Sequence, residues 1–252
     1  MKVRRGVAVC HFNRLDTLDQ IVKAVLETVP EDTRVVIADD GSTPIAGGLT
    51  VEGVAQDNNV LLIKGPNAGV AANKNRALWM LQDCHFITVL EDDLMPTEKG
   101  WFEQYEQAAT LSGIHHFCRV QRRMVAEAVP SFSAFMASHN LTPAFGPSPR
   151  GDFTFLTSAV VARVGAFNPR FRGAGYAHGN WSNRVFKSGL IPHPNKWVDI
   201  AEAGLKFKQI GDTAGGRWNQ DEAIIKRQMA RNKQVYKELE KSDAIYCPLV
   251  LE

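Results

Sequence analysis

The sequence predicts an α/β fold with a mostly parallel central sheet flanked by helices, and three observations support this prediction. Short β-branched runs alternate with segments whose apolar residues recur at helical spacing. Acidic and turn-forming residues end several of those runs abruptly. The chain has 252 residues, of which 44% are hydrophobic and 22% charged, and this is enough for one large domain. Sheets of this kind bind ligands at the carboxyl ends of their strands.

Four strands and two intervening helices are expected in the first hundred residues. Apolar and β-branched runs predict strands at residues 7–12, 34–38, 60–63 and 86–90. Helical spacing predicts one helix at residues 15–26 and another that follows the Gly- and Asn-rich loop at residues 65–69 and reaches about residue 81. Right-handed crossovers join such repeats, so the strands are expected to run parallel.

The rest of the chain is less regular. We expect a helix at residues 100–111, a long loop at residues 130–151, where several prolines occur, and a strand-like run at residues 154–163. Residues 220–241 are charged with a thin apolar stripe, which predicts a helix laid against the core or a partner. The expected division is a main domain at residues 1–215 and a C-terminal helical tail at residues 216–252.

Composition limits the class of protein. The formal net charge of +2 gives no overall positive field of the kind that a dedicated nucleic-acid binder shows. The four cysteines are scattered without metal-type spacing, so we expect them to be reduced and mostly structural. No apolar stretch approaches the length of a membrane span, and the basic N-terminus lacks a signal-peptide core. We therefore expect a cytoplasmic enzyme.

A pair of carboxylates, Asp92 and Asp93, follows the fourth expected strand directly. Like charges this close repel unless a cation or a hydrogen-bond donor compensates them. Mg²⁺ and Mn²⁺ favour carboxylate oxygens and leave positions open for phosphate oxygens, so the pair is a candidate metal site facing a diphosphate. The alternative is an ordinary solvated turn or the cap of the helix that follows Pro96.

Two further clusters occupy equivalent positions. Asp39 and Asp40 end the second strand, where an Asp-Gly turn is the alternative interpretation. The loop that contains Asn67 opens a helix with small residues and brings Lys74 near the helix N-terminus, where phosphates bind. Neither cluster is diagnostic by itself, but all three occur in order within the first 93 residues.

Four motifs carry a resemblance to a known family. They read VAVCHFNR at residues 7–14, IADDGS at residues 37–42, NAGVAANKN at residues 67–75, with Lys74 in place of the usual Arg, and VLEDDLMP at residues 89–96. In this order they resemble the "TYNR", "VDDGS", "N-x-G-x-x-x-A-R-N" and "DXD" motifs of family-2 glycosyltransferases. These enzymes have the GT-A fold, which is Rossmann-like.

The resemblance implies a metal-dependent transfer of a sugar from a nucleotide-sugar, most often a UDP-sugar, to an acceptor. It implies that Asp40 contacts the nucleotide base, that Lys74 contacts the nucleotide, and that Asp93 binds Mn²⁺ or Mg²⁺. Asp92 is then expected near the ribose or the sugar. The other expected donor-binding residues are Asn13, Asp39 and Asn67. Residues 1–97 would form the nucleotide-sugar half and residues 98–215 the acceptor half.

The downstream motif departs from the family. FNPRF at residues 167–171 is similar to the segment that precedes the acceptor-activating carboxylate, but the following stretch reads GYAHGNWSNR, and His178 falls at the position of the carboxylate. An imidazole can act as a general base near neutral pH, with an apparent pKa of about 6 to 7 expected, so we interpret His178 as the base. It is otherwise a metal ligand or a loop residue without chemistry. Asp152 and Asp199 are rival bases, and His193 is a candidate for completing the metal site.

Several functional classes stay open. An inverting transfer needs a base, whereas a retaining transfer does not, and the loss of the usual carboxylate keeps the retaining alternative. A binding module that has lost catalysis is the non-enzymatic alternative. Nucleotidyl transfer would place a Gly-rich basic loop after the first strand, and CHFNRLD at residues 10–16 is not such a loop. The acceptor is not resolved among glycan, glycolipid, protein and nucleic acid, although Arg119, Arg122 and Arg123 offer positive charge.

Overall fold

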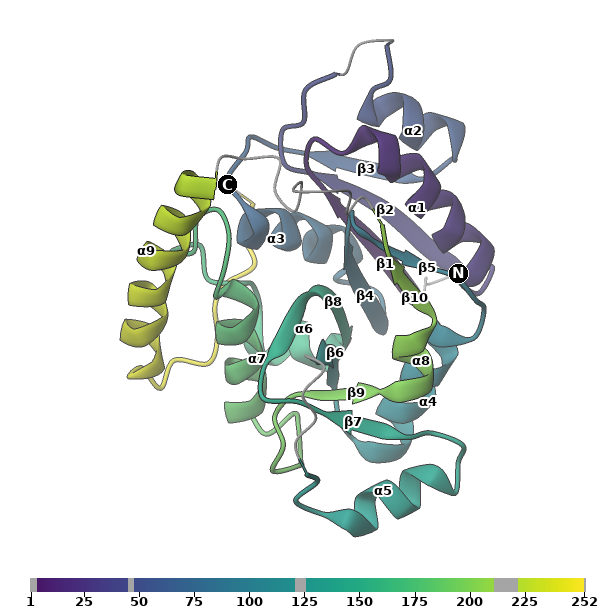
Figure 1. Ribbon diagram of the computed structural model, residues 1–252, viewed down its shortest axis with the longest axis vertical. Helices are drawn as coiled ribbons and strands as arrows, with labels where there is room; N and C mark the ends of the chain where they lie inside the picture. Colours follow the sequence, from purple (N-terminus) through teal and green to yellow (C-terminus); the bar gives the residue numbers. More distant parts are fainter. Residues whose placement is uncertain (1–3, 45–47, 121–125, 211–221, 252) are drawn as a thin grey trace.

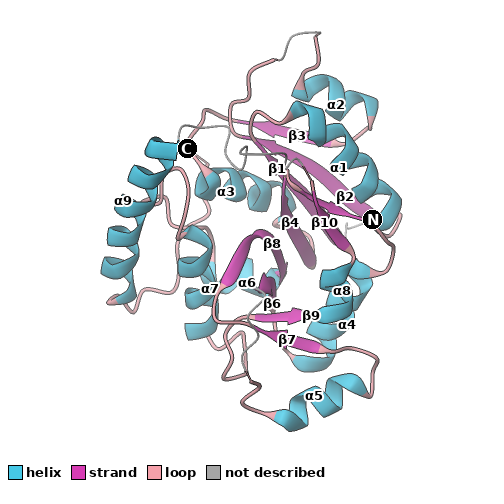
Figure 2. Cartoon of the chain, viewed as in Figure 1, coloured by secondary structure: helices cyan, strands magenta, loops and turns pink. Residues whose placement is uncertain are grey.

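A six-stranded mixed sheet forms the centre of the molecule. The computed structural model describes residues 4–44, 48–120, 126–210 and 222–251. The strand order is β3-β2-β1-β4-β8-β6, in which β3, β2, β1 and β4 run parallel, β8 is antiparallel to β4, and β6 is antiparallel to β8. Helices lie on both sides of this sheet (Figure 1; Figure 2). The predicted α/β fold with a mostly parallel sheet is confirmed.

The first half follows the predicted order. Its elements are β1 (Arg5–His11), α1 (Leu15–Thr28), β2 (Thr33–Asp39), α2 (Val51–Asp57), β3 (Leu61–Lys64), α3 (Val70–Leu81), β4 (Phe86–Glu91), β5 (Leu94–Pro96) and α4 (Trp101–Ser112). The sequence analysis missed α2, a short helix that begins where the side chain of Thr50 accepts a hydrogen bond from Gly53 N. It also missed β5, which has only three residues.

The second half contains more regular structure than predicted. Its elements are β6 (His116–Val120), α5 (Pro130–Ala137), β7 (Pro143–Phe145), β8 (Pro149–Thr157), α6 (Ser158–Val164), α7 (Ala177–Lys187), β9 (Val198–Ile200), α8 (Ala201–Leu205), β10 (Phe207–Gln209) and α9 (Glu222–Glu240).

Two predictions for this half were wrong. Residues 130–151 are not one long loop, because Pro130, Pro143 and Pro149 each stand at the start of an element, where the missing N–H is tolerated. Residues 154–163 are not one strand, because the chain leaves β8 after Thr157 and turns into α6, whose buried Val160 and Val164 are four residues apart.

The predicted C-terminal helix is present as α9, which packs against α7. The predicted domain boundary at residue 215 lies outside the described residues.

Alternation along β6 and β8 divides the side chains between two layers. Phe117, Phe153 and Phe155 form the aromatic core with α4, where the ring centroid of Tyr105 lies 4.8 Å from that of Phe153. Side chains of successive residues point to opposite faces of a sheet, so Thr154 faces α7 instead. The same rule places His116 on the α7 side. The two faces therefore carry different chemistry, apolar toward α4 and polar toward α7.

No helix among the described residues is long and apolar enough to cross a membrane. None of the four cysteines forms a disulfide, and three of them are buried.

Candidate active site

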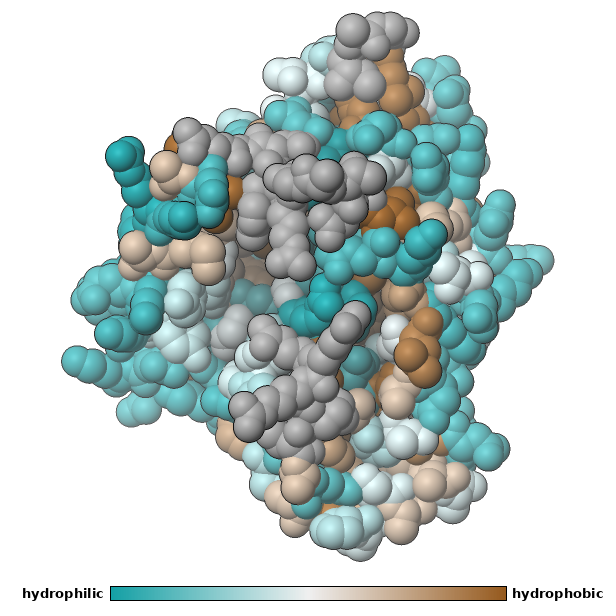
Figure 3. Space-filling model, in the orientation of Figure 1, coloured by the Kyte–Doolittle hydropathy of each residue, from teal (hydrophilic) through white to brown (hydrophobic). Residues whose placement is uncertain are grey.

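The carboxyl ends of β1, β2 and β4 meet at one edge of the sheet. The register pairs His11 with Asp39 and Cys10 with Glu91, so the three motifs that end these strands are brought together. Asn73 of α3 fixes two of the strand ends, because its Nδ2 donates to the carbonyls of His11 and Ala38. This is the edge at which open α/β sheets bind ligands. In the view of Figure 3, hydrophilic side chains gather near the centre of the molecule.

Asp92 and Asp93 lie within reach of one arginine. Asp92 accepts a hydrogen bond from Phe12 N at 2.9 Å, and His11 Nδ1 lies 3.0 Å from the same oxygen. Arg14 Nη1 lies 3.7 Å from Asp92 Oδ1 and 3.5 Å from Asp93 Oδ2. The guanidinium of Arg14 therefore supplies part of the charge compensation that the sequence led us to expect from a cation.

Lys74 is buried between the acidic cluster and the start of β8. Its Nζ forms an ion pair with Glu91 Oε1 at 2.9 Å and donates a hydrogen bond to the carbonyl of Gly151 at 2.5 Å. A buried ammonium group at the ends of parallel strands is well placed to meet a phosphate oxygen. The predicted neighbourhood of Lys74 and the acidic motif is thus present in the structure.

The acidic cluster has the electrostatics of a cation site. Burial, and the charge of Asp92, raise the pKa of Asp93, although Arg14 opposes this. Burial also raises the pKa of Glu91, where Lys74 acts in the opposite direction. Asp93 Oδ1 is buried and finds no hydrogen-bond donor among the described residues. Hard oxygen ligands with uncompensated negative charge fit Mn²⁺ or Mg²⁺.

Asp40 holds the Gly- and Asn-rich loop in place. Its carboxylate accepts hydrogen bonds from Ala68 N and Gly69 N and forms a buried ion pair with Arg76 Nη1 at 2.7 Å. The sequence analysis did not single out Arg76. Its position two residues after Lys74, in a helix that lies against the sheet, was the feature from which its place at the site could have been predicted. The expected contact of Asp40 with the nucleotide base stays a prediction. In that contact a base N–H would share the carboxylate with the three donors named above.

Three other predicted donor-binding residues lie at the same edge. Asp39 accepts from Ser42 N, and Asn13 Oδ1 accepts from Thr43 N at 2.9 Å, so the loops after β1 and β2 are bonded to each other. Asn67 is exposed on the loop that Asp40 holds. Their roles toward a donor stay predictions.

The Gly- and Asn-rich loop at residues 65–69 and the segment before α7 touch at two glycines, Gly69 and Gly173. Gly69 has a positive φ of 94°, and a Cβ built on it would lie 2.2 Å from Gly173 N. Only glycine permits this approach. Residues 65–69 and the N-terminus of α7, far apart in the sequence, are therefore held side by side.

His178 lies in the first turn of α7, facing β6 and β8. Its Nδ1 lies 3.2 Å from the hydroxyl oxygen of Thr154, and its Nε2 is buried without a hydrogen-bond partner among the described residues. Burial, followed by the positive charge of Lys74 and the neighbouring His116, lowers the pKa of His178 well below its usual value. The apparent pKa of about 6 to 7 expected from the sequence is therefore too high. The base role of His178 itself stays a prediction.

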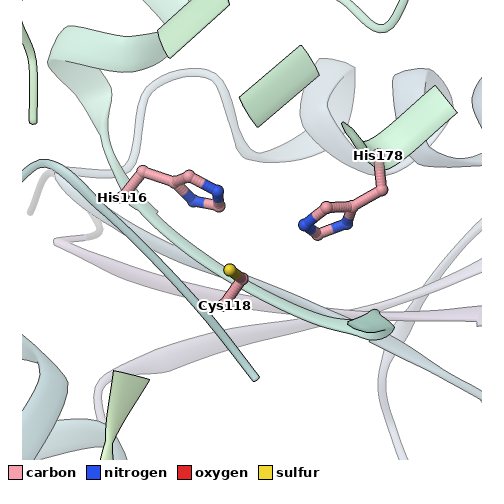
Figure 4. A group of neighbouring side chains, drawn as sticks. All are labelled: His116, Cys118 and His178. Atoms are coloured by element: carbon pink, nitrogen blue, oxygen red, sulfur yellow. The ribbon is translucent and has the colours of Figure 1, made fainter. Parts of the chain in front are cut away.

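Figure 4 shows the surroundings of this imidazole. The rings of His116 and His178 point toward each other above Cys118, and one ligand atom of each of the three residues lies within 4.8 Å of the others. Sequence analysis missed His116 and Cys118 as a pair. Their alternation with Phe117 along β6 could have predicted that the two side chains share one face of the sheet.

Asp152 lies beside the acidic cluster. Arg119 Nη1 and Arg150 Nε donate to its Oδ2 at 2.8 and 2.9 Å, and its Oδ1 is buried without a donor among the described residues. Its charge contributes to the raised pKa values of Glu91 and Asp93. The carbonyl of the preceding residue, Gly151, is the one that accepts from Lys74.

The second rival base, Asp199, lies in the aromatic core instead. Tyr105 Oη donates to its Oδ1 at 2.5 Å, and burial raises the pKa of Asp199 to about 7. The folded-state pKa therefore exceeds the unfolded value, so the folded protein binds one more proton between about pH 4 and 7. The contribution of this group to the free energy of unfolding is favourable in acid and declines as the pH rises through that window.

We expect this decline to amount to a few kcal/mol and to be absent from Asp199→Asn, which cannot ionise. Urea unfolding of both proteins at a series of pH values between 4 and 8 measures it, and Tyr105→Phe separates the hydrogen bond from the charge. Parallel pH profiles for the wild type and Asp199→Asn would refute the assignment.

The structure does not bring His193 to Asp93. The imidazole of His193 stacks on Phe145 and lies close to Phe132, and its Nε2 is 3.5 Å from Glu127 Oε1. No contact of His193 with the acidic cluster occurs among the described residues, so its role as a ligand of that metal stays an unsupported prediction. Trp181, near His178 on α7, is fully buried and stacks on Phe167. Arg122 and Arg123, which could offer positive charge to an acceptor, lie outside the described residues.

Comparisons with known proteins agree with this geometry. Residues 6–128 match the sequence profile of glycosyl transferase family 2. The fold is similar to a crystal structure of GalNAc-T7 with UDP, GalNAc and Mn²⁺, with a TM-score of 0.57 and 11% identity over 71% of this chain. It is also similar to the mannosyltransferase PcManGT from Pyrobaculum calidifontis in complex with GDP-Man and Mn²⁺, with a TM-score of 0.51 and 14% identity over 73% of this chain.

The chain spans 39% and 52% of the lengths of those two structures. No curated protein matches the sequence. The matched profile ends beyond the acidic cluster and includes all four motifs. Over residues 6–128 the chain resembles the family-2 glycosyltransferases, and its fold is that of the GT-A glycosyltransferases.

Proposed function

We propose that this protein transfers a sugar from a nucleoside-diphosphate sugar to an acceptor hydroxyl with inversion at the anomeric carbon, and that it requires Mn²⁺ or Mg²⁺. The observation that carries the proposal is the cluster of the partly buried carboxylates of Glu91 and Asp93 with the buried ammonium group of Lys74, at the ends of parallel strands. The cluster offers carboxylate oxygens for a cation and an ammonium group for a phosphate, which together suit a diphosphate leaving group.

Asp93, with Asp92 beside it, would hold the cation. When bound, this cation neutralises negative charge that develops on the departing diphosphate. Lys74 binds a phosphate oxygen, and its ion pair with Glu91 weakens as this new contact forms. Asn13, Asp39, Asp40 and Asn67 surround the nucleoside, because they lie on the three loops at the same edge.

An acceptor hydroxyl then attacks the anomeric carbon as the bond to the diphosphate breaks, and a base takes the hydroxyl proton. We propose Asp152 as this base. It adjoins the carbonyl that Lys74 contacts, its Oδ2 is fixed by two arginines, and its Oδ1 keeps lone pairs for a proton. His178, predicted from the sequence, is the alternative proton acceptor.

Two GT-A structures support the donor class, since one contains UDP and the other GDP-Man. We place UDP-sugars first among the donors to test, in line with the family resemblance. A retaining transferase would produce the opposite anomer from the proposed inverting transferase. A binding module would leave the donor uncleaved.

The test is a panel of UDP- and GDP-sugars incubated with the purified chain and Mn²⁺, with released nucleoside diphosphate measured by chromatography. We expect slow hydrolysis of at least one donor, loss of this activity with a chelator, and its return with Mn²⁺. If folded protein binds a donor and never cleaves it, with or without candidate acceptors, the chain is a binding module. NMR of a transferred product distinguishes inversion from retention.

A further inference from the structure

The residues around His178 form a second group of potential ligands whose chemistry differs from that of the acidic cluster. His116 and Cys118 lie two residues apart on β6 and therefore project from the same face of the sheet. His178 reaches this face from the first turn of α7. One ligand atom from each residue lies within 4.8 Å of the other two, and all three side chains are buried (Figure 4).

Hydrogen bonds fix which ring nitrogen of each histidine is available. His116 Nδ1 lies 3.0 Å from the carbonyl oxygen of Phe155, which only accepts, so Nδ1 carries the proton and Nε2 carries the lone pair. His178 Nδ1 lies 3.2 Å from the hydroxyl of Thr154, which leaves Nε2 of His178 as the atom without a partner among the described residues. A metal-bound histidine is usually oriented in this way, through a hydrogen bond from its other nitrogen.

Burial holds both imidazoles in the neutral form that a metal requires. It lowers the pKa of His116 to about 4, and with Lys74 it lowers the pKa of His178. The carboxylates of Asp199 and Asp152 add, after burial, to the raised pKa of the Cys118 thiol.

We propose that His116, Cys118 and His178 form a site for a borderline-soft divalent metal ion of the Zn²⁺ class, separate from the Mn²⁺ or Mg²⁺ site at Asp93. Two imidazoles and one thiolate are ligands that Zn²⁺ prefers and that Mn²⁺ and Mg²⁺ do not. In a tetrahedral zinc site the ligand atoms lie roughly 3.3–3.6 Å apart, so the three side chains must converge by about 1 Å from their present positions.

The site leaves one position of the tetrahedron to a ligand such as water. The hydroxyl of Ser182, now 2.9 Å from His116 Nε2, would turn away as the lone pair of that nitrogen binds the metal. The metal would tie the N-terminus of α7 to β6 beneath the donor site. A metal-bound Nε2 has no lone pair for a proton, which gives His178 a positioning role and leaves the base role to Asp152.

The experiment measures metal content on the full chain, after expression in medium that contains zinc and dialysis without chelator. We expect about one Zn²⁺ per chain in the wild type, and a loss of about tenfold or more in Cys118→Ser and in His178→Ala. Cys84→Ser and His115→Gln are the matched controls, because Cys84 is also a buried thiol and His115 bonds to Thr157 instead. Both controls should keep the zinc content of the wild type.

A second measurement does not depend on the folding of the variants. Chelator-treated wild-type protein is titrated with Co²⁺, and a bound thiolate produces a visible charge-transfer absorption that excess Zn²⁺ removes. The proposal is overturned if the wild-type protein contains no zinc and also shows no such absorption with Co²⁺. It is overturned as well if Cys118→Ser keeps the zinc content of the wild type. Donor hydrolysis with Mn²⁺, assayed on the same samples, shows separately whether the proposed transferase function holds.

Discussion

Asp93→Asn is expected to reduce Mn²⁺-dependent donor cleavage by roughly 100-fold or more. The substitution keeps the size of the side chain and removes the carboxylate charge that the cation requires. Asp93 is the member of the acidic pair with a buried, unpartnered oxygen among the described residues, whereas Asp92 is already bonded to Phe12 N. Initial rates with chelator-treated protein and added Mn²⁺ measure the effect.

The control for this variant is Glu98→Gln. Glu98 is an exposed carboxylate five residues downstream, and its substitution removes the same charge without touching the cluster. It should cleave the donor at the wild-type rate. A wild-type rate for Asp93→Asn under saturating Mn²⁺ would remove Asp93 from the metal site and would show that the acidic motif is only a turn.

Asp152→Asn is expected to lower kcat for transfer by roughly 100-fold or more while leaving donor affinity nearly unchanged. The amide keeps a hydrogen-bond acceptor for Arg119 and Arg150 but cannot take a proton from an acceptor hydroxyl. A general base acts on the attacking hydroxyl in the transition state, so KM for the donor should change little. Steady-state kinetics with varied donor measure the two parameters separately.

The companion variant is His178→Gln, which distinguishes the two candidate bases. If His178 were the base, its lowered pKa would keep it neutral at and above pH 6.5, and the rate would fall only in more acidic solution. Near-normal kcat for Asp152→Asn, together with a large loss of kcat and unchanged zinc content in His178→Gln, would assign the base role to His178.

Sequence patterns anticipated the strands and helices of the first half of the chain well. Residues 7–12, 34–38 and 86–90 are strands because their apolar runs are buried on both faces of a parallel sheet, and each run ends at the polar residues that form the site. Asp93 and Lys74 could be placed from order and spacing, since the carboxyl ends of parallel strands share one edge.

The second half could not be anticipated to the same degree, for physical reasons. Prolines at positions 130, 143 and 149 indicate breaks, yet each stands at the beginning of an element rather than within a loop. The pairing of Asp40 with Arg76, and of His178 with His116 and Cys118, depends on contacts between distant segments. The lowered pKa of His178 follows from burial, which a local sequence window does not reveal.

The central claim is that the acidic cluster and Lys74 bind a nucleoside diphosphate together with a divalent cation. Isothermal titration calorimetry with UDP and with GDP, each in the presence of Mn²⁺ and of a chelator, tests it most directly. The account predicts that at least one of the two nucleotides binds about tenfold or more tightly with Mn²⁺, because cation and diphosphate share the site and stabilise each other's binding. Equal affinity with and without Mn²⁺ for both nucleotides, or no binding of either to folded protein, would contradict it.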